Sequence, residues 1–455
     1  MMLTKLFNKH SARFGVDDIV ASLQARYPRM PEFHQSVRDV SEDIMPYVNE
    51  QKSESLYQAL HYLTEPDQVV SFRVNWQDDN NRMQFNRGYR VQFNNALGPY
   101  KGGLRLDPKL NLSVLYFLGF EQTFKNSLTG LPMGGAKGGA DFDPHGKSEA
   151  EIQRFCRAFM TQLARHIGPE TDVPAGDIGV STREIAYLFD QYRTITGKFS
   201  GVLTGKAPVF GGSCFREEAT GYGCVYFAEQ VLAHKDAGLA DQTCAISGAG
   251  NVALYTAEKL IELGAKVITL SDRQGVAHFA QGLTQEQLSQ IRQHRYQRGT
   301  LKSLSKQEGW QFHARAKPWS LETDLAFACA TQNELELADA KQLVKNSCQA
   351  VFEGANMPCT SEAVDYLREA SITLAPSKAV NAGGVAVSGL EISQNNLRMP
   401  WQADEVEQEL QRIMRNIHES CVEHGTTQAG VDYKQGANIA AFLKLSEAIE
   451  LYGLA

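Results

Sequence analysis

One lysine of this sequence is enclosed by glycines. Residues 131–142 read Leu-Pro-Met-Gly-Gly-Ala-Lys-Gly-Gly-Ala-Asp-Phe, with four glycines around Lys137. Backbone built from glycine can approach a ligand closely, because glycine has no side chain. The segment therefore predicts a loop that leaves the ammonium group of Lys137 accessible to a small molecule. By itself it is equally consistent with a tight glycine turn that bears a solvated lysine.

Two further lysines and a glutamine stand in comparable settings. Lys101 lies among glycines in Gly-Pro-Tyr-Lys-Gly-Gly at 98–103. Gln122 and Lys125 lie on a helix predicted over 112–128, and their spacing places both on one face of that helix. An isolated pair of this kind is more often a solvated surface pair, so the spacing alone leaves its role open.

A dinucleotide-binding motif follows later in the chain. Residues 243–247 read as a buried strand, and Gly248-Ala249-Gly250-Asn251-Val252-Ala253 opens a helix. Two glycines, with an alanine in place of the last one, match the fingerprint of this fold in its strand–turn–helix context. Such glycines admit a pyrophosphate to the free N–H groups of the helix N-terminus. The residues that we expect to contact the cofactor here are Gly248, Gly250, Asn251 and Val252.

The next strand leaves the form of the cofactor open. It ends at Ser271-Asp272-Arg273. An acid about 20 residues past the glycines usually binds the ribose 2′-hydroxyl of NAD, whereas a nearby arginine accommodates the 2′-phosphate of NADP. Other polar clusters follow short apolar segments, and from these we expect Gln332 and Asn356 to lie near the nicotinamide, although each also fits a plain turn.

These groups together indicate an oxidoreductase. The carboxylate of Asp177 lies on a predicted rigid loop at 172–179. If Lys101, Lys125 and Lys137 converge, two ammonium groups ~4 Å apart repel by roughly 4 kcal/mol, which lowers the pKa of one lysine towards neutrality. A neutral lysine beside an aspartate suits proton transfer on an amine, and two charged lysines suit a substrate with two carboxylates. The pattern predicts oxidative deamination of an amino dicarboxylic acid, with hydride transfer to a nicotinamide.

The elements that must position these groups change in character along the chain. The first third mixes helices with an antiparallel hairpin, whereas strands and helices alternate from about residue 210, which is typical of a parallel sheet. We expect two domains packed around one cleft. The other predicted elements are a helix from Pro31, hairpin strands over 70–76 and 83–93, helices capped by Ser148 and Ser181 and stopped by Gly168 and Gly197, and long helices over 404–424 and 439–451.

Composition excludes several classes of protein. The chain has 455 residues and a net charge of -7, which is unsuited to a nucleic-acid binder. No apolar run approaches the ~20 residues that a membrane helix needs. The eight cysteines form no CxxC pair and no metal-ligand spacing, so we expect no metal site and reduced thiols in a cytoplasmic protein. The first sixteen residues are basic, and we expect a folded helix there rather than a targeting segment.

Longer stretches of the sequence resemble glutamate dehydrogenases, of the Glu/Leu/Phe/Val dehydrogenase family. The resemblance covers essentially the whole chain in order and is greatest to the NADP-linked, homohexameric branch of bacteria and fungi. Besides the segments at 131–142 and 172–179, it rests on Gly-Pro-Tyr-Lys-Gly-Gly at 98–103, Gly-Phe-Glu-Gln-Thr-Phe-Lys-Asn at 119–126, Gly-Gly-Ser at 211–213, Arg-Glu-Glu-Ala-Thr-Gly-Tyr-Gly at 216–223 and Ser-Gly-Leu-Glu at 388–391.

The resemblance implies a role for each site residue. Lys137 would activate water and stabilise an imino intermediate, and Asp177 would carry protons to and from the amino nitrogen. The other implied contacts are those of Lys125, Gln122 and the Gly176 backbone with the α-carboxylate, of Lys101 and Ser388 with the side-chain carboxylate, and of Thr220 and Asn251 with the cofactor.

The resemblance also implies the organisation of an α/β molecule. A substrate-binding and oligomerisation domain with a mixed sheet would cover residues 1–208, completed by a C-terminal helix at 432–455. A Rossmann-like domain over 209–431 would bind NADP or NADPH across a cleft. The implied substrates are 2-oxoglutarate, ammonia and L-glutamate. The implied assembly is a cytoplasmic homohexamer with no nucleic-acid or membrane partner.

Three alternatives remain open at this stage. An NAD-linked glutamate dehydrogenase would share every motif above. Leucine, valine and phenylalanine dehydrogenases share the fold and the lysine segment, but they need an apolar side-chain pocket, which Lys101 and Ser388 disfavour. An inactive nucleotide-binding or scaffold protein would have no use for both Lys137 and Asp177.

Overall fold

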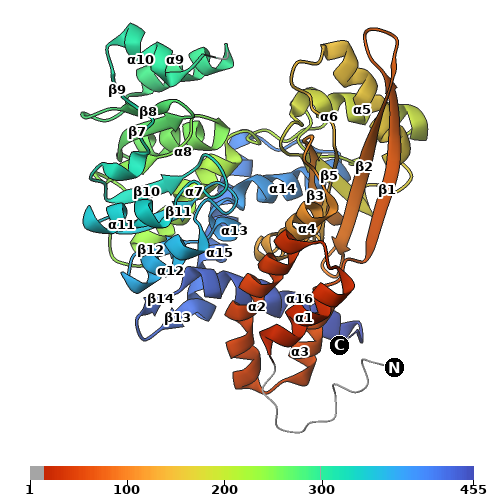
Figure 1. Cartoon of the computed structure of the whole chain (residues 1–455), viewed down its shortest axis with the longest axis horizontal. Helices are drawn as coiled ribbons and strands as arrows, with labels where there is room; N and C mark the ends of the chain where they lie inside the picture. The colour runs from red at the N-terminus through yellow and green to blue at the C-terminus, as the bar shows by residue number, and fades with distance from the viewer. Residues whose placement is uncertain (1–14, 298, 455) are drawn as a thin grey trace. The chain divides into compact units, whose positions relative to one another are not determined.

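The computed structural model describes residues 15–297 and 299–454, which form two compact units (Figure 1). Unit 1 contains the described residues up to Ser127, Met133–Lys198 and those from Ala441 onward. Unit 2 contains Leu128–Pro132 and Phe199–Ala440. The helix expected within the first sixteen residues lies outside the described part of the chain.

Unit 1 is built on a mixed five-stranded sheet, as the resemblance implied. The strand order is β1-β2-β4-β3-β5. β2 is antiparallel to β1 and β4, and β3 is parallel to β4 and β5. The elements are α1 (Val16–Arg26), α2 (Pro31–Gln51), α3 (Glu54–Tyr62), β1 (Gln68–Gln77), β2 (Met83–Asn94), β3 (Tyr100–Leu106), α4 (Leu112–Leu128), β4 (Gly135–Ala140), α5 (Glu149–Leu163), β5 (Asp172–Gly176) and α6 (Thr182–Thr196).

The predicted hairpin and helix caps of unit 1 are confirmed. β1 and β2 pair as an antiparallel hairpin, and capping boxes begin α5 and α6. α6 stops at Gly197, whose φ is 66°. α5 ends at Leu163 rather than at the predicted Gly168, because Gly168 pairs with Asp172 in the turn that leads into β5.

The glycine-rich segments predicted as loops are strands instead. Lys101 lies in β3, Lys137 lies in β4, and β5 directly precedes Asp177. Glycine lets these strands pack closely: a Cβ on Gly102 would lie 1.6 Å from the carbonyl oxygen of Ala136. β4 contains none of the β-branched and aromatic residues by which strands are recognised. The prediction of a loop was therefore wrong, because these glycines serve the close packing of neighbouring strands rather than a turn.

Unit 2 contains a seven-stranded, Rossmann-like sheet in the order β12-β11-β10-β6-β7-β8-β9. The strands from β12 to β7 are parallel, and β8 and β9 add an antiparallel edge. The strand order reverses between β6 and β10, the switch point at which such sheets bind ligands. The strands are β6 (Thr243–Ile246), β7 (Lys266–Asp272), β8 (Gly275–His278), β9 (Gln311–Ala314), β10 (Leu325–Ala328), β11 (Ala350–Glu353) and β12 (Thr373–Ala375), with a small hairpin of β13 (Thr426–Thr427) and β14 (Gly430–Val431).

Helices cover this sheet and close the chain. The last one, α16 (Tyr433–Leu451), begins before the predicted residue 439, and its part from Ala441 onward belongs to unit 1. The other helices are α7 (Ala219–Ala233), α8 (Asn251–Glu262), α9 (Gln285–Tyr296), α10 (Leu301–Glu308), α11 (Leu337–Lys345), α12 (Ser361–Glu369), α13 (Ser377–Val380), α14 (Gly383–Leu397) and α15 (Ala403–Gly425).

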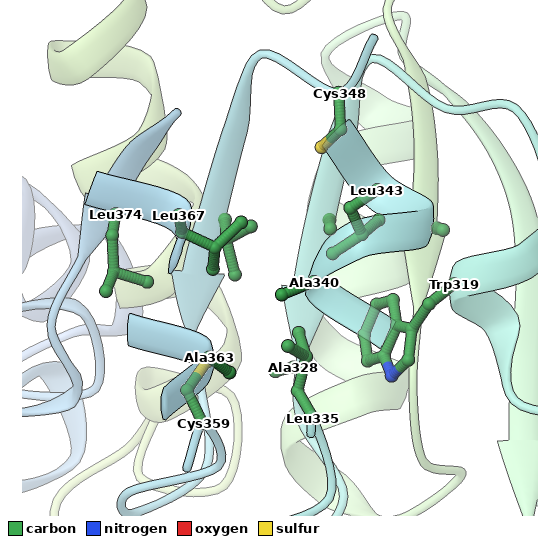
Figure 2. Close-up of a cluster of buried hydrophobic side chains, with 13 residues drawn as sticks. Trp319, Ala328, Leu335, Ala340, Leu343, Cys348, Cys359, Ala363, Leu367 and Leu374 are labelled. Atoms are coloured by element: carbon green, nitrogen blue, oxygen red, sulfur yellow. The ribbon is translucent and has the colours of Figure 1, made fainter. Parts of the chain in front are cut away.

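A buried cluster supports the loops that follow the parallel strands (Figure 2). It joins α11 and α12 to β10, β11 and β12, and burial of each large apolar side chain contributes about 1.5–3 kcal/mol. The loops that follow β10 and β11 therefore start from a rigid base. The large members of the cluster are Trp319, Leu335, Leu343, Leu367 and Leu374.

Among residues 15–297 and 299–454, no helix is long and apolar enough to cross a membrane. The same residues contain no group of three or more His, Cys, Asp or Glu side chains arranged to hold a metal ion. All eight cysteines are free thiols, of which Cys214 is half-buried and the others are buried.

Candidate functional site

Lys137 and Asp177 form an ion pair in unit 1. Nζ of Lys137 lies 3.0 Å from Oδ2 of Asp177, and 6% and 18% of the two side chains are exposed. The same oxygen accepts a hydrogen bond from Nε of Arg105 at 2.8 Å. Oδ2 of the carboxylate thus lies between two cations.

Burial and neighbouring charges shift the pKa values of both members of this pair. Burial is the largest effect on Lys137 and lowers its pKa; Asp177 opposes the decrease, and Arg105 and Arg90 add to it. Burial acts in the opposite sense on Asp177, yet Lys137 and Arg105 together lower the pKa of this carboxyl to about 2. Asp177 is therefore an anion near neutral pH, and Lys137 loses its proton more readily than an ordinary lysine. The expected decrease in the pKa of Lys137 is present, but the neighbouring charges that add to it are those of Arg105 and Arg90 rather than those of other lysines.

Gly103 makes room for this pair. It lies in β3 between Lys101 and Arg105, and alternate residues of a strand share one face. A Cβ at this position would lie 2.8 Å from Cβ of Asp177 and 3.4 Å from Nζ of Lys137. A glycine is thus required for the carboxylate and the ammonium group to meet above β3.

A second, fully buried ion pair holds β5 in the sheet. Nε of Arg90, in β2, donates to Oδ2 of Asp172 at 2.9 Å, and neither side chain is exposed. Nη1 of the same arginine donates to the carbonyl oxygen of Gly102 at 3.0 Å, and Gln92 also donates to Asp172. These bonds connect β2, β3 and β5, and so they fix the strand that leads to Asp177.

The predicted substrate residues of unit 1 lie on neighbouring elements. α4 carries Gln122 and Lys125, both half-buried. Asn126 of the same helix donates to the carbonyl oxygens of Lys101 in β3 and of Gly134 just before β4. Lys101 is 1% exposed. One helix therefore contacts both strands that carry the other two lysines.

Ser388 and Thr220 lie in unit 2, whereas Gly176 ends β5 in unit 1. Oγ of Ser388, in α14, accepts a hydrogen bond from Nε of Arg216 at 3.2 Å and donates to the carbonyl oxygen of Gly384 at 3.0 Å. A Cβ on Gly384 would lie 2.4 Å from Oγ1 of Thr220. The start of α14 therefore brings Ser388 and Thr220 to one small region of unit 2.

The glycine turn after β6 has the form of an anion site. Gly248 has a φ of 89°, and a Cβ there would lie 3.1 Å from the carbonyl oxygen of Cys329, so that only glycine fits. No side chain in the described part of the chain caps the N-terminus of α8, and a Cβ on Gly250 would meet nothing within 4 Å. The first N–H groups of α8, at Asn251 and Val252, are left for a ligand.

The end of β7 is held by hydrogen bonds to other parts of unit 2. Oγ of Ser271 accepts the N–H of Gly248 at 2.9 Å. Asp272 accepts two backbone N–H groups at 2.8 Å, and one of them belongs to Leu301 at the start of α10. Arg273 is exposed. The acid of the predicted Ser-Asp-Arg motif thus has a structural role.

The polar loops after β10 and β11 lie together. The N–H of Asn333 donates to the carbonyl oxygen of Met357 at 2.9 Å, and Nδ2 of Asn381 donates to Oδ1 of Asn356 at 3.0 Å. Gln332 and Asn356 are both exposed. The structure thus brings the three predicted polar clusters to the carboxyl ends of the parallel strands.

Sequence reasoning missed several charged residues. Arg105 lies on the same face of β3 as Lys101, but the glycines at 102 and 103 predict a loop, in which this spacing carries no signal. Glu334 accepts a hydrogen bond from Oγ of Ser247 at 2.7 Å, and burial raises the pKa of its carboxyl. Nothing in the local sequence marks Glu334, or marks Arg216 as the partner of the serine in α14.

Comparisons with known proteins agree over almost the whole chain. A sequence model of the Glutamate/Leucine/Phenylalanine/Valine dehydrogenase family matches residues 211–453. A second one, described as the Glu/Leu/Phe/Val dehydrogenase dimerisation domain, matches residues 66–194.

Individual relatives are similar to this chain throughout. The NAD(P)-specific glutamate dehydrogenase of Xylanibacter ruminicola is 49% identical, over 96% of this chain and 99% of its own length. The NADP-specific glutamate dehydrogenase of Escherichia coli is 48% identical, over 97% of this chain and 99% of its own length. The crystal structure of Plasmodium falciparum glutamate dehydrogenase superposes with a TM-score of 0.94 at 47% identity, over 96% of this chain and 94% of that chain.

Proposed function

This chain belongs to the glutamate/leucine/phenylalanine/valine dehydrogenase family, and we propose that it is an NADP-dependent glutamate dehydrogenase. It converts 2-oxoglutarate, ammonia (as the ammonium ion), NADPH and a proton to L-glutamate, NADP and water, and it catalyses the reverse oxidative deamination. The observation that carries this proposal is the buried pair of Lys137 and Asp177. The likeness to an NADP-specific glutamate dehydrogenase over nearly the full length supports it.

The pair supplies the two protonation states that the reaction needs. In the oxidative direction, neutral Lys137 takes a proton from the water that attacks the imino carbon, and its ammonium form returns that proton in the reductive direction. Asp177 accepts and donates the protons of the amino nitrogen. When bound, the nicotinamide supplies or accepts the hydride.

The remaining polar residues hold the two carboxylates of the substrate. Lys125, Gln122 and the backbone N–H of Gly176 bind the α-carboxylate, and Lys101 and Ser388 bind the side-chain carboxylate. The buried charge of Lys101 complements a second carboxylate but not an apolar side chain. This difference favours glutamate over leucine or phenylalanine.

The residues of unit 2 fit a dinucleotide. The glycine turn and the uncapped N-terminus of α8 suit a pyrophosphate. The residues that would hold the cofactor are Gly248, Gly250, Asn251 and Val252 at the pyrophosphate, Ser271, Asp272 and Arg273 near the adenosine ribose, and Thr220, Gln332 and Asn356 towards the nicotinamide.

The organisation of the whole enzyme belongs to the same proposal. Residues 1–208 with 432–455 form the substrate-binding and oligomerisation domain, and residues 209–431 form the NADP-binding domain. Six chains assemble into a homohexamer. The enzyme works in the cytoplasm, where eight free thiols stay reduced.

Initial rates with a small panel of substrates test this function. The rates of NADPH and NADH oxidation are compared with ammonium and either 2-oxoglutarate or 4-methyl-2-oxopentanoate. We expect kcat/KM with NADPH to favour 2-oxoglutarate by at least ~100-fold. A protein that prefers 4-methyl-2-oxopentanoate would be a different member of the family, and one that prefers NADH would be an NAD-linked enzyme.

A further inference from the structure

Asn126, on α4, is a buried amide whose oxygen and nitrogen both form hydrogen bonds. Its side chain lies in a residue that is 0% exposed. Nδ2 donates to the carbonyl oxygen of Lys101 in β3 at 3.1 Å and to that of Gly134, which directly precedes β4. Oδ1 accepts a hydrogen bond from Nε2 of Gln122 at 2.7 Å, one turn earlier on the helix. One side chain therefore connects α4, β3 and the start of β4.

These partners determine which way both amides face. A carbonyl oxygen can only accept a hydrogen bond, so the end of Asn126 that faces Lys101 and Gly134 must be its NH2 group. The oxygen of Asn126 then faces Gln122, and only the NH2 group of Gln122 can donate to it. Reversal of either amide would place two acceptors against each other, which is costly inside a protein.

The amide of Gln122 keeps one donor for a ligand. Its nitrogen has two N–H groups, of which Asn126 takes one. Among residues 15–297 and 299–454, the side chain of Gln122 has no other hydrogen-bond partner. It is half-buried, as is Lys125, which lies three residues further on the same face of α4. A donor of fixed direction and a positive charge thus lie on one face of the helix.

We infer that Asn126 is a positioning residue for the α-carboxylate of the substrate. It turns Gln122 so that the amide offers an N–H group to the carboxylate. A carboxylate only accepts hydrogen bonds, so a glutamine turned the other way would present its carbonyl oxygen and repel the substrate. The inference rests on the proposed function, in which Gln122 and Lys125 bind this carboxylate.

A double-mutant cycle on the full chain tests this role. KM and kcat for 2-oxoglutarate, at saturating NADPH and ammonium, are measured for the wild type, Asn126→Ala, Gln122→Leu and the variant with both substitutions. Asn126→Ala is expected to raise KM by ~5-fold to 20-fold and to change kcat by less than about 3-fold, because a binding contact is lost. In the Gln122→Leu background, the same substitution is expected to change KM by less than about 2-fold, because the amide that Asn126 orients is absent.

Ser127→Ala is the matched control. Ser127 is the next residue of α4 and is also buried, and its Oγ donates to the carbonyl oxygen of Ala441 at 3.0 Å. This variant likewise removes a buried hydrogen bond from α4 to a backbone carbonyl, so it is expected to lower Tm and to keep the wild-type KM and kcat. Should Asn126→Ala fail to fold, Asn126→Leu, which fills the space without a polar atom, replaces it in both backgrounds.

The outcomes separate this inference from the proposed function. A wild-type KM for Asn126→Ala, or an increase of the same size in both backgrounds, would overturn the inference. If Gln122→Leu keeps the wild-type KM, Gln122 does not bind the carboxylate and the inference is also wrong. A wild type that reduces 4-methyl-2-oxopentanoate instead of 2-oxoglutarate is not a glutamate dehydrogenase. The same cycle then tests the inference with that substrate, because both acids have an α-carboxylate.

Discussion

At the scale of single residues, the chemistry depends on two cations that share one carboxylate oxygen. Arg105 and Lys137 both contact Oδ2 of Asp177. The positive charge of the guanidinium favours the ionised carboxyl of Asp177 and makes the ammonium form of Lys137 less favourable. Burial is the main cause of the lowered pKa of Lys137, and we infer that Arg105 is a positioning residue that adds to this decrease.

Removal of this charge should change the pH dependence of the reaction. Glutamate oxidation needs neutral Lys137, so kcat rises as the pH passes the pKa of the lysine. Arg105 lowers that pKa, and Arg105→Met is therefore expected to raise it and to move the acid limb of the kcat profile to higher pH. Initial rates across the pH range, at saturating glutamate and NADP, measure this shift. An acid limb that stays in place or moves to lower pH would show that Arg105 does not tune the lysine.

Substrate choice should depend on two other residues. We expect the double variant Lys101→Leu with Ser388→Val to lose activity on glutamate and to gain some on norleucine, because it removes a positive charge and a hydroxyl donor from the predicted side-chain site. The ratio of kcat/KM for glutamate over norleucine should fall by at least ~100-fold. A double variant with the wild-type ratio would remove both residues from the specificity pocket.

At the scale of secondary structure, regular periodicity made most elements predictable. Alternation revealed the hairpin of β1 and β2, and capping boxes revealed α5 and α6. The Rossmann-like turn was recognised because its glycines meet a local steric demand, as the positive φ of Gly248 shows. Strands β3, β4 and β5 were missed because their backbones are shaped by contacts with each other. The ion pairs of Arg90 and Arg105 were hidden with them, since the partners lie 82 and 72 residues away in the chain.

The buried ion pair of Arg90 and Asp172, which holds β5 in the sheet, should be essential for stability. Arg90→Met leaves the carboxylate of Asp172 buried without its counter-charge, and such a loss costs about 3–5 kcal/mol. We expect a large decrease in Tm, measured by scanning calorimetry. The double variant Arg90→Met with Asp172→Leu removes both buried charges of this pair and should recover much of the loss. An Arg90→Met protein as stable as the wild type would contradict this account of how β5 is held.

At the scale of the whole molecule, the chain divides its chemistry between two compact units. The ion pair of Lys137 and Asp177 belongs to unit 1, and the glycine turn belongs to unit 2. Both matched family segments, including the one described as a dimerisation domain, are present in one chain. The sequence alone could not show how many copies assemble, because no periodic pattern encodes that number.

The proposed assembly can be measured directly. We expect light scattering after size-exclusion chromatography to give a mass six times that of one chain. The expectation follows from the likeness to glutamate dehydrogenases and from the match to a dimerisation domain. A monodisperse dimer with full activity would contradict the proposed hexamer without affecting the proposed chemistry.

The most direct measurement of the central claim uses Lys137→Ala and records turnover and cofactor binding together. Glutamate formation from 2-oxoglutarate, ammonium and NADPH is followed by absorbance, and NADPH binding is followed by fluorescence. We expect kcat to fall by at least ~10³-fold, because the group that exchanges the proton of water is gone, with the Kd for NADPH changed by less than about 3-fold. Lys109→Ala, which removes an exposed lysine of the same unit, should behave as the wild type. A Lys137→Ala enzyme that keeps a near-wild-type kcat would contradict the account.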